Sequence, residues 1–113
     1  MANAKKNAKK KAVRGSRTAR PIMVLLDLLG QRWTLRVIWE LRGHRRSFRD
    51  LQAQCDAVSP TVLNSRLKSL REAGIVDLEA EGYGLTASGR ELGLQLAELD
   101  GWAKRWARSR TTK

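Results

Sequence analysis

The chain has 113 residues and a formal charge of +12, from 23 Lys and Arg against 11 Asp and Glu. This length suggests one domain, and such basicity points first to nucleic acid and second to an anionic membrane surface. The single cysteine, Cys55, excludes an intramolecular disulfide, and with only one histidine, His44, the chain offers little to bind a metal. We expect no metal and no cofactor. The lack of a nucleophile–base pair argues against an enzyme.

The positive charge gathers at the two ends of the chain. Residues 1–20 hold eight basic residues and residues 104–113 hold five, and neither segment contains an acid. Residues 1–20 have little to bury, so we expect a disordered basic tail there and a shorter basic tail at 108–113. The long tail is either an arm that adds phosphate contacts or a solvated segment without function.

No part of the sequence is typical of a membrane protein. The longest strongly apolar run, PIMVLLDLLG, is far shorter than the roughly 18 residues of a membrane span. The basic N-terminus lacks the apolar core of a secretion signal. We therefore expect a cytoplasmic protein, associated with the nucleoid when it is bound to DNA, and no membrane partner.

The folded part begins with two short apolar helices. Pro21 opens the first, which we expect to run from Ile22 to Leu29 and to end at Gly30. The second is expected from Trp33 to Arg42. Apolar residues on most sides of both helices predict that they are packed on most sides.

A third helix is predicted in the segment SFRDLQAQC. Ser47 is a suitable N-cap, with Asp50 three residues later as its capping partner. Phe48, Leu51 and Cys55 recur at the spacing of a helical core stripe. Cys55 is therefore predicted to be a small buried residue rather than a redox sensor.

A fourth helix follows after the three-residue turn 56–58. Ser59 is a good N-cap, Pro60 suits the first helical position, and Gly74 ends the helix. Two helices with apolar stripes, joined by so short a turn, predict a helix-turn-helix.

The next residues alternate between apolar and polar in the pattern of a small β-hairpin. One face is expected to carry Val76, Leu78 and Ala80, followed after the turn at Gly82 by Tyr83 and Leu85. The opposite face is expected to carry Asp77, Glu79 and Glu81.

Thr86 is a suitable cap for a long last helix, expected from about Ala87 to Ser109. At about 1.5 Å per residue it would be longer than a small core requires, so its surplus length predicts a partner. We expect a homodimer whose interface includes residues of the first and last helices: Leu25, Leu28, Leu92, Leu96, Leu99, Trp102 and Trp106.

The fourth helix carries small hydrogen-bonding side chains opposite its leucine stripe. With Leu63, Leu67 and Leu70 toward the core, the opposite side presents the candidate base-facing residues Thr61, Asn64, Ser65 and Lys68. The second helix of a helix-turn-helix enters the major groove, where such side chains can read base edges. A solvated surface is the alternative interpretation.

Phosphate contacts are expected around this face. The candidates are Arg45, Arg46, Arg49, Ser59 and Arg71. The first three are equally explained as solvated side chains or as partners of Asp50.

The order of helix, helix, helix-turn-helix, hairpin and long helix resembles the winged-helix regulators of the HxlR type, relatives of the MarR group. The resemblance covers about residues 21 to 107 and rests on these segments: LDLLGQRWTLRVIWEL, SFRDL, VSPTVLNSRLKSLREAGIV and YGLTASGREL. It implies a mainly α winged helix-turn-helix fold and a homodimeric transcription regulator that binds double-stranded DNA. Its recognition helix would begin at Ser59.

The sequence departs from the family pattern in three places. The wing is short and acidic, so we assign it no DNA contact. Arg20 stands where many members have a cysteine, which gives no support to thiol sensing of that kind. The basic tails are not a family feature and are a candidate substitute for contacts of a longer wing.

Two other functions fit the sequence. One is sequence-independent binding of nucleic acid by the basic tails, and the other is a protein-interaction module that keeps the winged-helix shape without reading DNA. No cluster of polar residues marks a pocket, so a small-molecule effector stays unknown.

Overall fold

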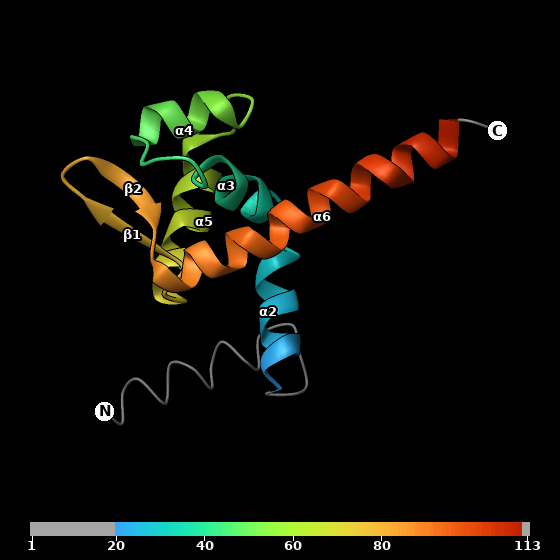
Figure 1. Ribbon diagram of the computed structural model, residues 1–113. Coiled ribbons are helices and arrows are strands. Elements are labelled where there is room, and N and C mark those ends of the chain that lie inside the picture. Colours follow the sequence, from blue (N-terminus) through green and yellow to red (C-terminus); the bar gives the residue numbers. More distant parts are fainter. Residues whose placement is uncertain (1–19, 112–113) are drawn as a thin grey trace.

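The computed structural model describes residues 20–111, which form a mainly helical fold with one small hairpin (Figure 1). The elements are α2 (Pro21–Leu29), α3 (Thr34–Glu40), α4 (Phe48–Gln54), α5 (Pro60–Glu72), β1 (Val76–Glu79), β2 (Gly82–Leu85) and α6 (Ala87–Thr111). Their order confirms the predicted winged helix-turn-helix. The expected disordered tail lies outside the described residues, apart from Arg20.

The hydrophobic core lies where α3, α4 and α5 meet the base of the hairpin. Val37 and Ile38 of α3, Leu51 of α4 and Leu67 of α5 have no exposed surface. Cys55 is equally buried, as its position in the apolar stripe predicts. The core residues are Val37, Ile38, Leu41, Leu51, Cys55, Val58, Leu63, Leu67, Leu70, Ile75, Val76 and Leu85.

The predicted caps are present at the ends of the helix-turn-helix. The hydroxyl of Ser47 accepts a hydrogen bond from the backbone N–H of Asp50 at 3.0 Å. The hydroxyl of Ser59 accepts one from the N–H of Val62 at 3.1 Å. At the other end of α5, Gly74 has a φ of 75°, a left-handed conformation that glycine adopts without strain.

The hairpin joins α5 to α6 through Thr86. The strands are antiparallel, with Val76 opposite Leu85 and Glu79 opposite Gly82. The Thr86 hydroxyl accepts from the N–H of Gly89 at 3.0 Å and lies 2.6 Å from the carbonyl oxygen of Gly74, to which it donates. One hydroxyl therefore caps α6 and ties it to the end of α5.

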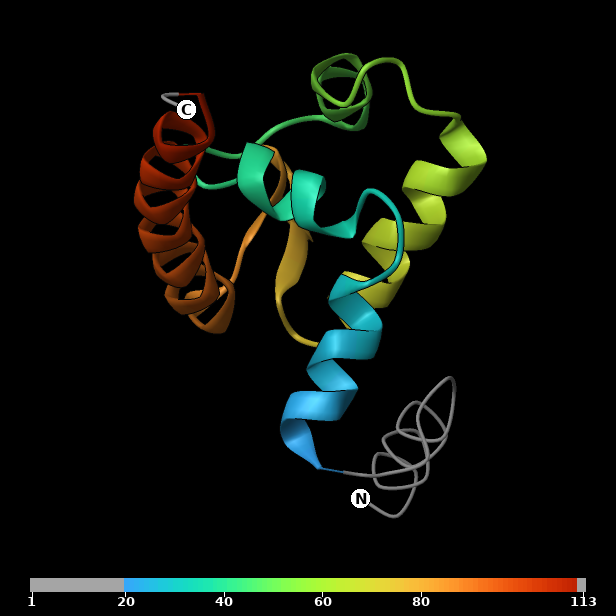
Figure 2. The ribbon, with the colours of Figure 1, turned by 90° about the vertical axis from the view of Figure 1, so that its right-hand side faces the viewer.

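The second half of α6 extends beyond the body of the domain, and α2 projects in another direction (Figures 1 and 2). The helix reaches Thr111, so it includes residues 108–111, which we expected to belong to a tail. Conversely, α3 is shorter than predicted, because Trp33 has a φ of 79° and stands outside the helix. Within residues 20–111, no helix combines the length and the apolar character that a membrane crossing requires.

Candidate DNA-binding surface

One face of the helix α5 is apolar and buried, and the opposite face is polar and exposed. Leu63, Leu67 and Leu70 have no exposed surface, which fixes the rotation of the helix. The four side chains that we expect to face bases are all exposed: Thr61, Asn64, Ser65 and Lys68. The structure thus presents these residues together on one face of α5, and their contact with bases stays a prediction.

The turn that precedes α5 has a strained backbone. Asp56 and Ala57 have φ values of 57° and 58°, which are uncommon for residues with a Cβ atom. Two side chains hold the turn: Gln52 Nε2 donates to the carbonyl of Val58 at 2.9 Å, and Arg36 Nη1 lies 3.5 Å from Asp56 Oδ2. Sequence reasoning missed Arg36, because its partner follows 20 residues later in the chain.

Three of the predicted phosphate contacts lie exposed around the N-terminal part of the motif or along α5: Arg49, Ser59 and Arg71. Among residues 20–111, no ion pair occupies Arg49 or Arg71. Both guanidinium groups therefore keep their donors for an external anion.

The other two predicted phosphate contacts are engaged within the protein. Arg46 Nη1 lies 2.8 Å from Asp50 Oδ2, and its Nε donates to the carbonyl of Glu40 at 2.7 Å. Pairing with Asp50 is the alternative that the sequence left open for this group of arginines. To contact a phosphate, Arg46 would have to exchange these partners.

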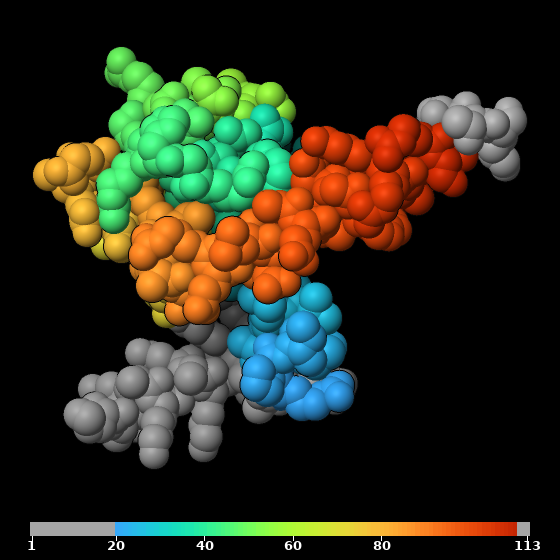
Figure 3. Space-filling model, in the orientation of Figure 1, coloured from blue at the N-terminus to red at the C-terminus, as the bar shows by residue number. Residues whose placement is uncertain are grey.

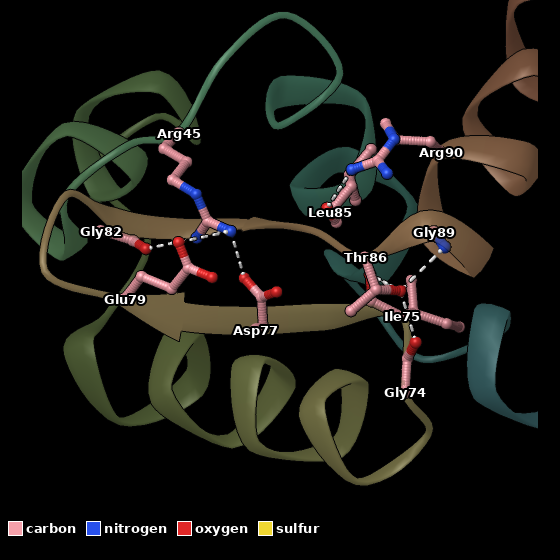
Figure 4. Close-up of polar contacts among 10 residues, drawn as sticks. All are labelled: Arg45, Gly74, Ile75, Asp77, Glu79, Gly82, Leu85, Thr86, Gly89 and Arg90. Carbon is pink, nitrogen blue, oxygen red and sulfur yellow. Dashed lines mark hydrogen bonds and ion pairs between the residues drawn. The ribbon is translucent and has the colours of Figure 1, made fainter.

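Arg45 fastens the hairpin to the loop before α4 (Figure 4). Its Nη2 lies 2.7 Å from Asp77 Oδ1 and 3.3 Å from Glu79 Oε1, and its Nη1 donates to the carbonyl of Gly82 at 2.9 Å. The hydrogen bond to Asp77 raises the pKa of the Arg45 guanidinium. Two of the three acids that we expected on the outer face of the hairpin are therefore paired with this cation.

The same loop approaches the hairpin closely along its backbone. The N–H of Arg46 donates to the carbonyl of Tyr83 at 3.0 Å, and the N–H of Tyr83 donates to the carbonyl of Arg46 at 2.9 Å. A Cβ atom at Gly82 would lie 2.5 Å from Arg46 O, and one at Gly84 would lie 2.7 Å from Arg45 Cζ. The two glycines thus permit the contact that places Arg45 over the strands.

A polar hollow of about 550 Å³ lies along the side of α5, facing the turn between α2 and α3. Arg66 Nε donates across it to the carbonyl of Arg32 at 2.6 Å. Its lining includes Ser65 and Lys68 of the exposed face, together with Gln31, Arg66, Ser69 and Glu72. Sequence reasoning missed Gln31 and Arg66, because the α2–α3 turn reaches α5 only in the folded chain.

The residues predicted for a dimer interface divide into two groups. Leu28, Leu92 and Leu96 pack against the core of their own chain, and Leu25 is half-buried. These four are therefore wholly or partly used within the chain.

The second group is exposed at the far end of α6. Leu99, Trp102 and Trp106 are 55%, 51% and 48% exposed, and the two indole rings stack with centroids 5.8 Å apart. On α2, Ile22 and Leu26 are also about half exposed, although sequence reasoning did not select them. A group of large exposed apolar side chains such as that at the end of α6 is typical of a surface that another protein covers.

No group of three or more His, Cys, Asp or Glu side chains that could hold a metal ion occurs in the described part of the chain. The groups on the surface around α5 are amide, hydroxyl, ammonium and guanidinium, together with the carboxylate of Glu72. Their chemistry is that of hydrogen bonding and charge pairing with an anionic polymer.

Comparison with known proteins points to one family of regulators. Residues 28–111 match the family model described as HxlR-like helix-turn-helix. The HTH-type transcriptional regulator YvaP of Bacillus subtilis is 32% identical over 88 residues, which cover 72% of this chain and 82% of YvaP. The HTH-type transcriptional regulator Rv3095 of Mycobacterium tuberculosis is 36% identical over 84 residues, covering 68% of this chain; the chain spans about half (52%) of its length.

Several solved structures have a similar fold. The crystal structure of the quinone-bound YodB of Bacillus subtilis has a TM-score of 0.69 and 28% identity, covering 74% of this chain and 96% of YodB. A possible HxlR family transcriptional factor of Thermoplasma volcanium has a TM-score of 0.66 and 28% identity, covering 74% of this chain and 82% of its own. A MarR family regulator of Enterococcus faecalis has a TM-score of 0.71 and 24% identity, covering 81% of this chain and 90% of its own. At this identity the match shows a shared fold.

Proposed function

The chain belongs to the HxlR-like helix-turn-helix family and is a transcription regulator with a DNA-binding domain, and we propose that it binds double-stranded DNA as a symmetric homodimer. In this proposal α5, which begins after Ser59, enters the major groove. Thr61, Asn64, Ser65 and Lys68 face base edges. The two helices of the dimer read half-sites about one helical turn apart.

The observation that carries the proposal is the exposed face of α5. Its side chains are short or flexible donors and acceptors, which permit close approach to base edges. Asn64 offers both a donor and an acceptor, the pair that suits adenine, while Lys68 suits guanine or a phosphate. The fully buried leucines on the other side of α5 hold this face outward.

The charges around α5 support phosphate contacts by Arg49, Ser59 and Arg71. Both arginines have no ion pair within residues 20–111, and Ser59 lies at the helix N-terminus, where backbone N–H groups favour an anion. We assign Arg45 a different role. By pairing with Asp77 and Glu79 it lowers the negative potential of the hairpin, which would otherwise repel DNA. Arg46 contributes only if it leaves Asp50.

The exposed apolar side chains of α2 and α6 support the homodimer. The α6 helix of 25 residues is about 37 Å long, and its second half carries Leu99, Trp102 and Trp106 into solvent. Exposed indoles at a helix end are typical anchors of an interface. We propose that they pack against a second copy of the chain, together with Ile22 and Leu26.

The experiment that tests the proposal selects the preferred duplex from a random library with the full chain and then measures variants on it. We expect Asn64→Ala and Lys68→Ala each to weaken binding to the selected duplex by about 1–3 kcal/mol per protomer and to relax base preference at one position of each half-site. The matched control is Gln95→Ala, an exposed polar truncation on α6.

Two results would contradict the proposal in different ways. If the library yields no preferred sequence while binding is strong at low salt, the chain binds nucleic acid through charge alone. If both α5 variants bind as the wild type does, another surface reads the DNA.

A further inference from the structure

A groove of about 450 Å³ runs along the first half of α6. In Figure 3 the first turns of α6, in orange, lie beside the segment that follows α3, in green. The end of β2 forms part of the groove. The residues that line it are Arg42, Leu85, Ala87, Arg90, Glu91, Gly93, Leu94 and Ala97.

Two arginines of this groove are held in place by uncharged groups. The stem of Arg42 lies against Gly93, where an added Cβ would be 3.4 Å from Arg42 Cγ, and its guanidinium carbon is 3.6 Å from the centre of the Trp39 ring. Arg90 Nη1 donates to the carbonyl of Leu85 at 3.1 Å (Figure 4). Each contact orients a guanidinium without neutralising it.

Within residues 20–111 the two arginines, like Arg49 and Arg71, have no acidic partner. Arg36, Arg45 and Arg46 all pair with carboxylates. In the described residues, neither Arg42 nor Arg90 has a carboxylate oxygen within 4.0 Å.

The other charged and titratable groups of this face leave an excess of positive charge. Glu91 lines the groove but pairs with neither of its arginines at ion-pair distance. A smaller hollow of about 170 Å³ shares Arg42, Leu85 and Arg90 with the groove and adds His44 and Arg45. Since Arg45 is held by acids of the hairpin, the positive charge that faces the groove comes from Arg42 and Arg90, two guanidinium groups against the one carboxylate of Glu91.

The rest of the lining is apolar. Leu94 has a large apolar side chain, yet it is 69% exposed. Ala87 and Ala97 leave room beside it, and Leu85 forms a wall that continues into the core. A groove of this size that combines apolar walls with a few polar groups is typical of a site for a small organic ligand.

We propose that this groove binds a small carboxylic acid with an apolar body. The guanidinium groups of Arg42 and Arg90 hold the carboxylate, because a guanidinium presents paired donors that match the two oxygens of a carboxylate. The body of the acid lies against Leu85, Leu94 and Ala97. This site goes beyond the proposed DNA-binding function and does not depend on it.

The test is calorimetric titration of the full chain, without DNA, with three probes: 2-naphthoate, the neutral 2-naphthamide, and inorganic phosphate. We expect saturable binding of naphthoate at one site per chain. The amide and phosphate are expected to bind at least tenfold more weakly, since one lacks the charge and the other lacks the apolar body.

The variants Arg42→Gln and Arg90→Gln are each expected to weaken naphthoate binding at least tenfold, the loss typical of one charge-assisted contact. Arg105→Gln removes the same charge from an exposed position farther along α6 and is expected to bind as the wild type does. Ala97→Trp, which fills the groove while both arginines remain, is expected to abolish binding. Circular dichroism checks that each variant is folded.

Three results would overturn the proposal: no saturable binding of naphthoate, equal affinity for naphthoate and its amide or phosphate, or unchanged affinity in both arginine variants. None of these results bears on DNA binding, so the two proposals fail or hold separately.

Discussion

Ser59 caps α5, and it is also a proposed contact of a DNA phosphate. Two substitutions separate these roles. In Ser59→Ala, the hydrogen bond from the N–H of Val62 at 3.1 Å is lost. Loss of a serine N-cap costs about 1 kcal/mol, so we expect the midpoint of thermal unfolding to fall by about 4–8 °C for a domain of this size.

Ser59→Asp keeps the cap and adds a negative charge at the same place. Aspartate caps a helix as well as serine does and interacts favourably with the helix dipole, so we expect no loss of thermal stability. At about 5 Å from a phosphate, in water, the added charge costs about 0.8 kcal/mol. In a dimer this occurs twice, so the affinity for duplex DNA should fall about tenfold to twentyfold.

Fluorescence anisotropy with a labelled duplex measures this loss, and circular dichroism measures the unfolding midpoint. The loss should shrink as salt is added, because counterions screen the repulsion. If Ser59→Asp binds duplex DNA as tightly as the wild type at low salt, no phosphate lies at the N-terminus of α5. If Ser59→Ala unfolds at the wild-type temperature, the cap contributes nothing to stability.

Three further predictions concern the hairpin, the core and the end of α6. Arg45→Gln should weaken DNA binding as measured by fluorescence anisotropy. If Arg45 acts by neutralising the hairpin, adding Asp77→Asn should restore part of the affinity. No recovery in the double variant would indicate a direct phosphate contact of Arg45 instead. Burial raises the pKa of the Cys55 thiol, so the stability that the neutral thiol contributes is present below its unfolded pKa of about 8.5 and is lost as pH rises through the higher folded pKa. Urea titrations should therefore show the free energy of unfolding of the wild type falling, relative to Cys55→Ala, above about pH 8.5; parallel pH profiles would contradict this. Trp102→Glu should convert the dimer to a monomer in sedimentation at micromolar concentration, while Arg105→Gln should not; a monomeric wild type would refute the dimer.

Local sequence signals predict most of the fold. Ser47, Ser59 and Thr86 each accept the capping hydrogen bond that their positions predict. Gly74 ends α5 as expected, and the alternating residues after it form the hairpin. These features depend on neighbours within a few residues, so the sequence alone contains the information.

The ion pairs of the hairpin depend on contacts between distant parts of the chain. Arg45 and Gly82, which it bonds, are 37 residues apart. The residues next to Arg45 in the sequence do not distinguish it from the exposed Arg49. The sequence therefore predicts a phosphate contact for both. The close approach at Gly82 and Gly84 becomes visible only when the loop lies on the strands.

The apolar stripe of α6 illustrates a second limit. Leu92 and Leu96 pack on the core of their own chain, whereas Leu99 and Trp102 are half exposed. All four continue one helical pattern, because periodicity reports which face is apolar and not what covers it. The apolar stripe changes from buried to exposed where α6 leaves the body of the domain. The position of that change depends on how α6 packs against α3 and β2.

The most direct test of DNA readout by α5 is the affinity of the full chain for a duplex from its own promoter region and for a scrambled duplex, both at near-physiological salt. We expect a preference of at least about a hundredfold, a threshold set below the roughly thousandfold or greater ratios that are typical, and a smaller preference in Asn64→Ala. Equal affinity for the two duplexes would contradict sequence reading by the exposed face of α5.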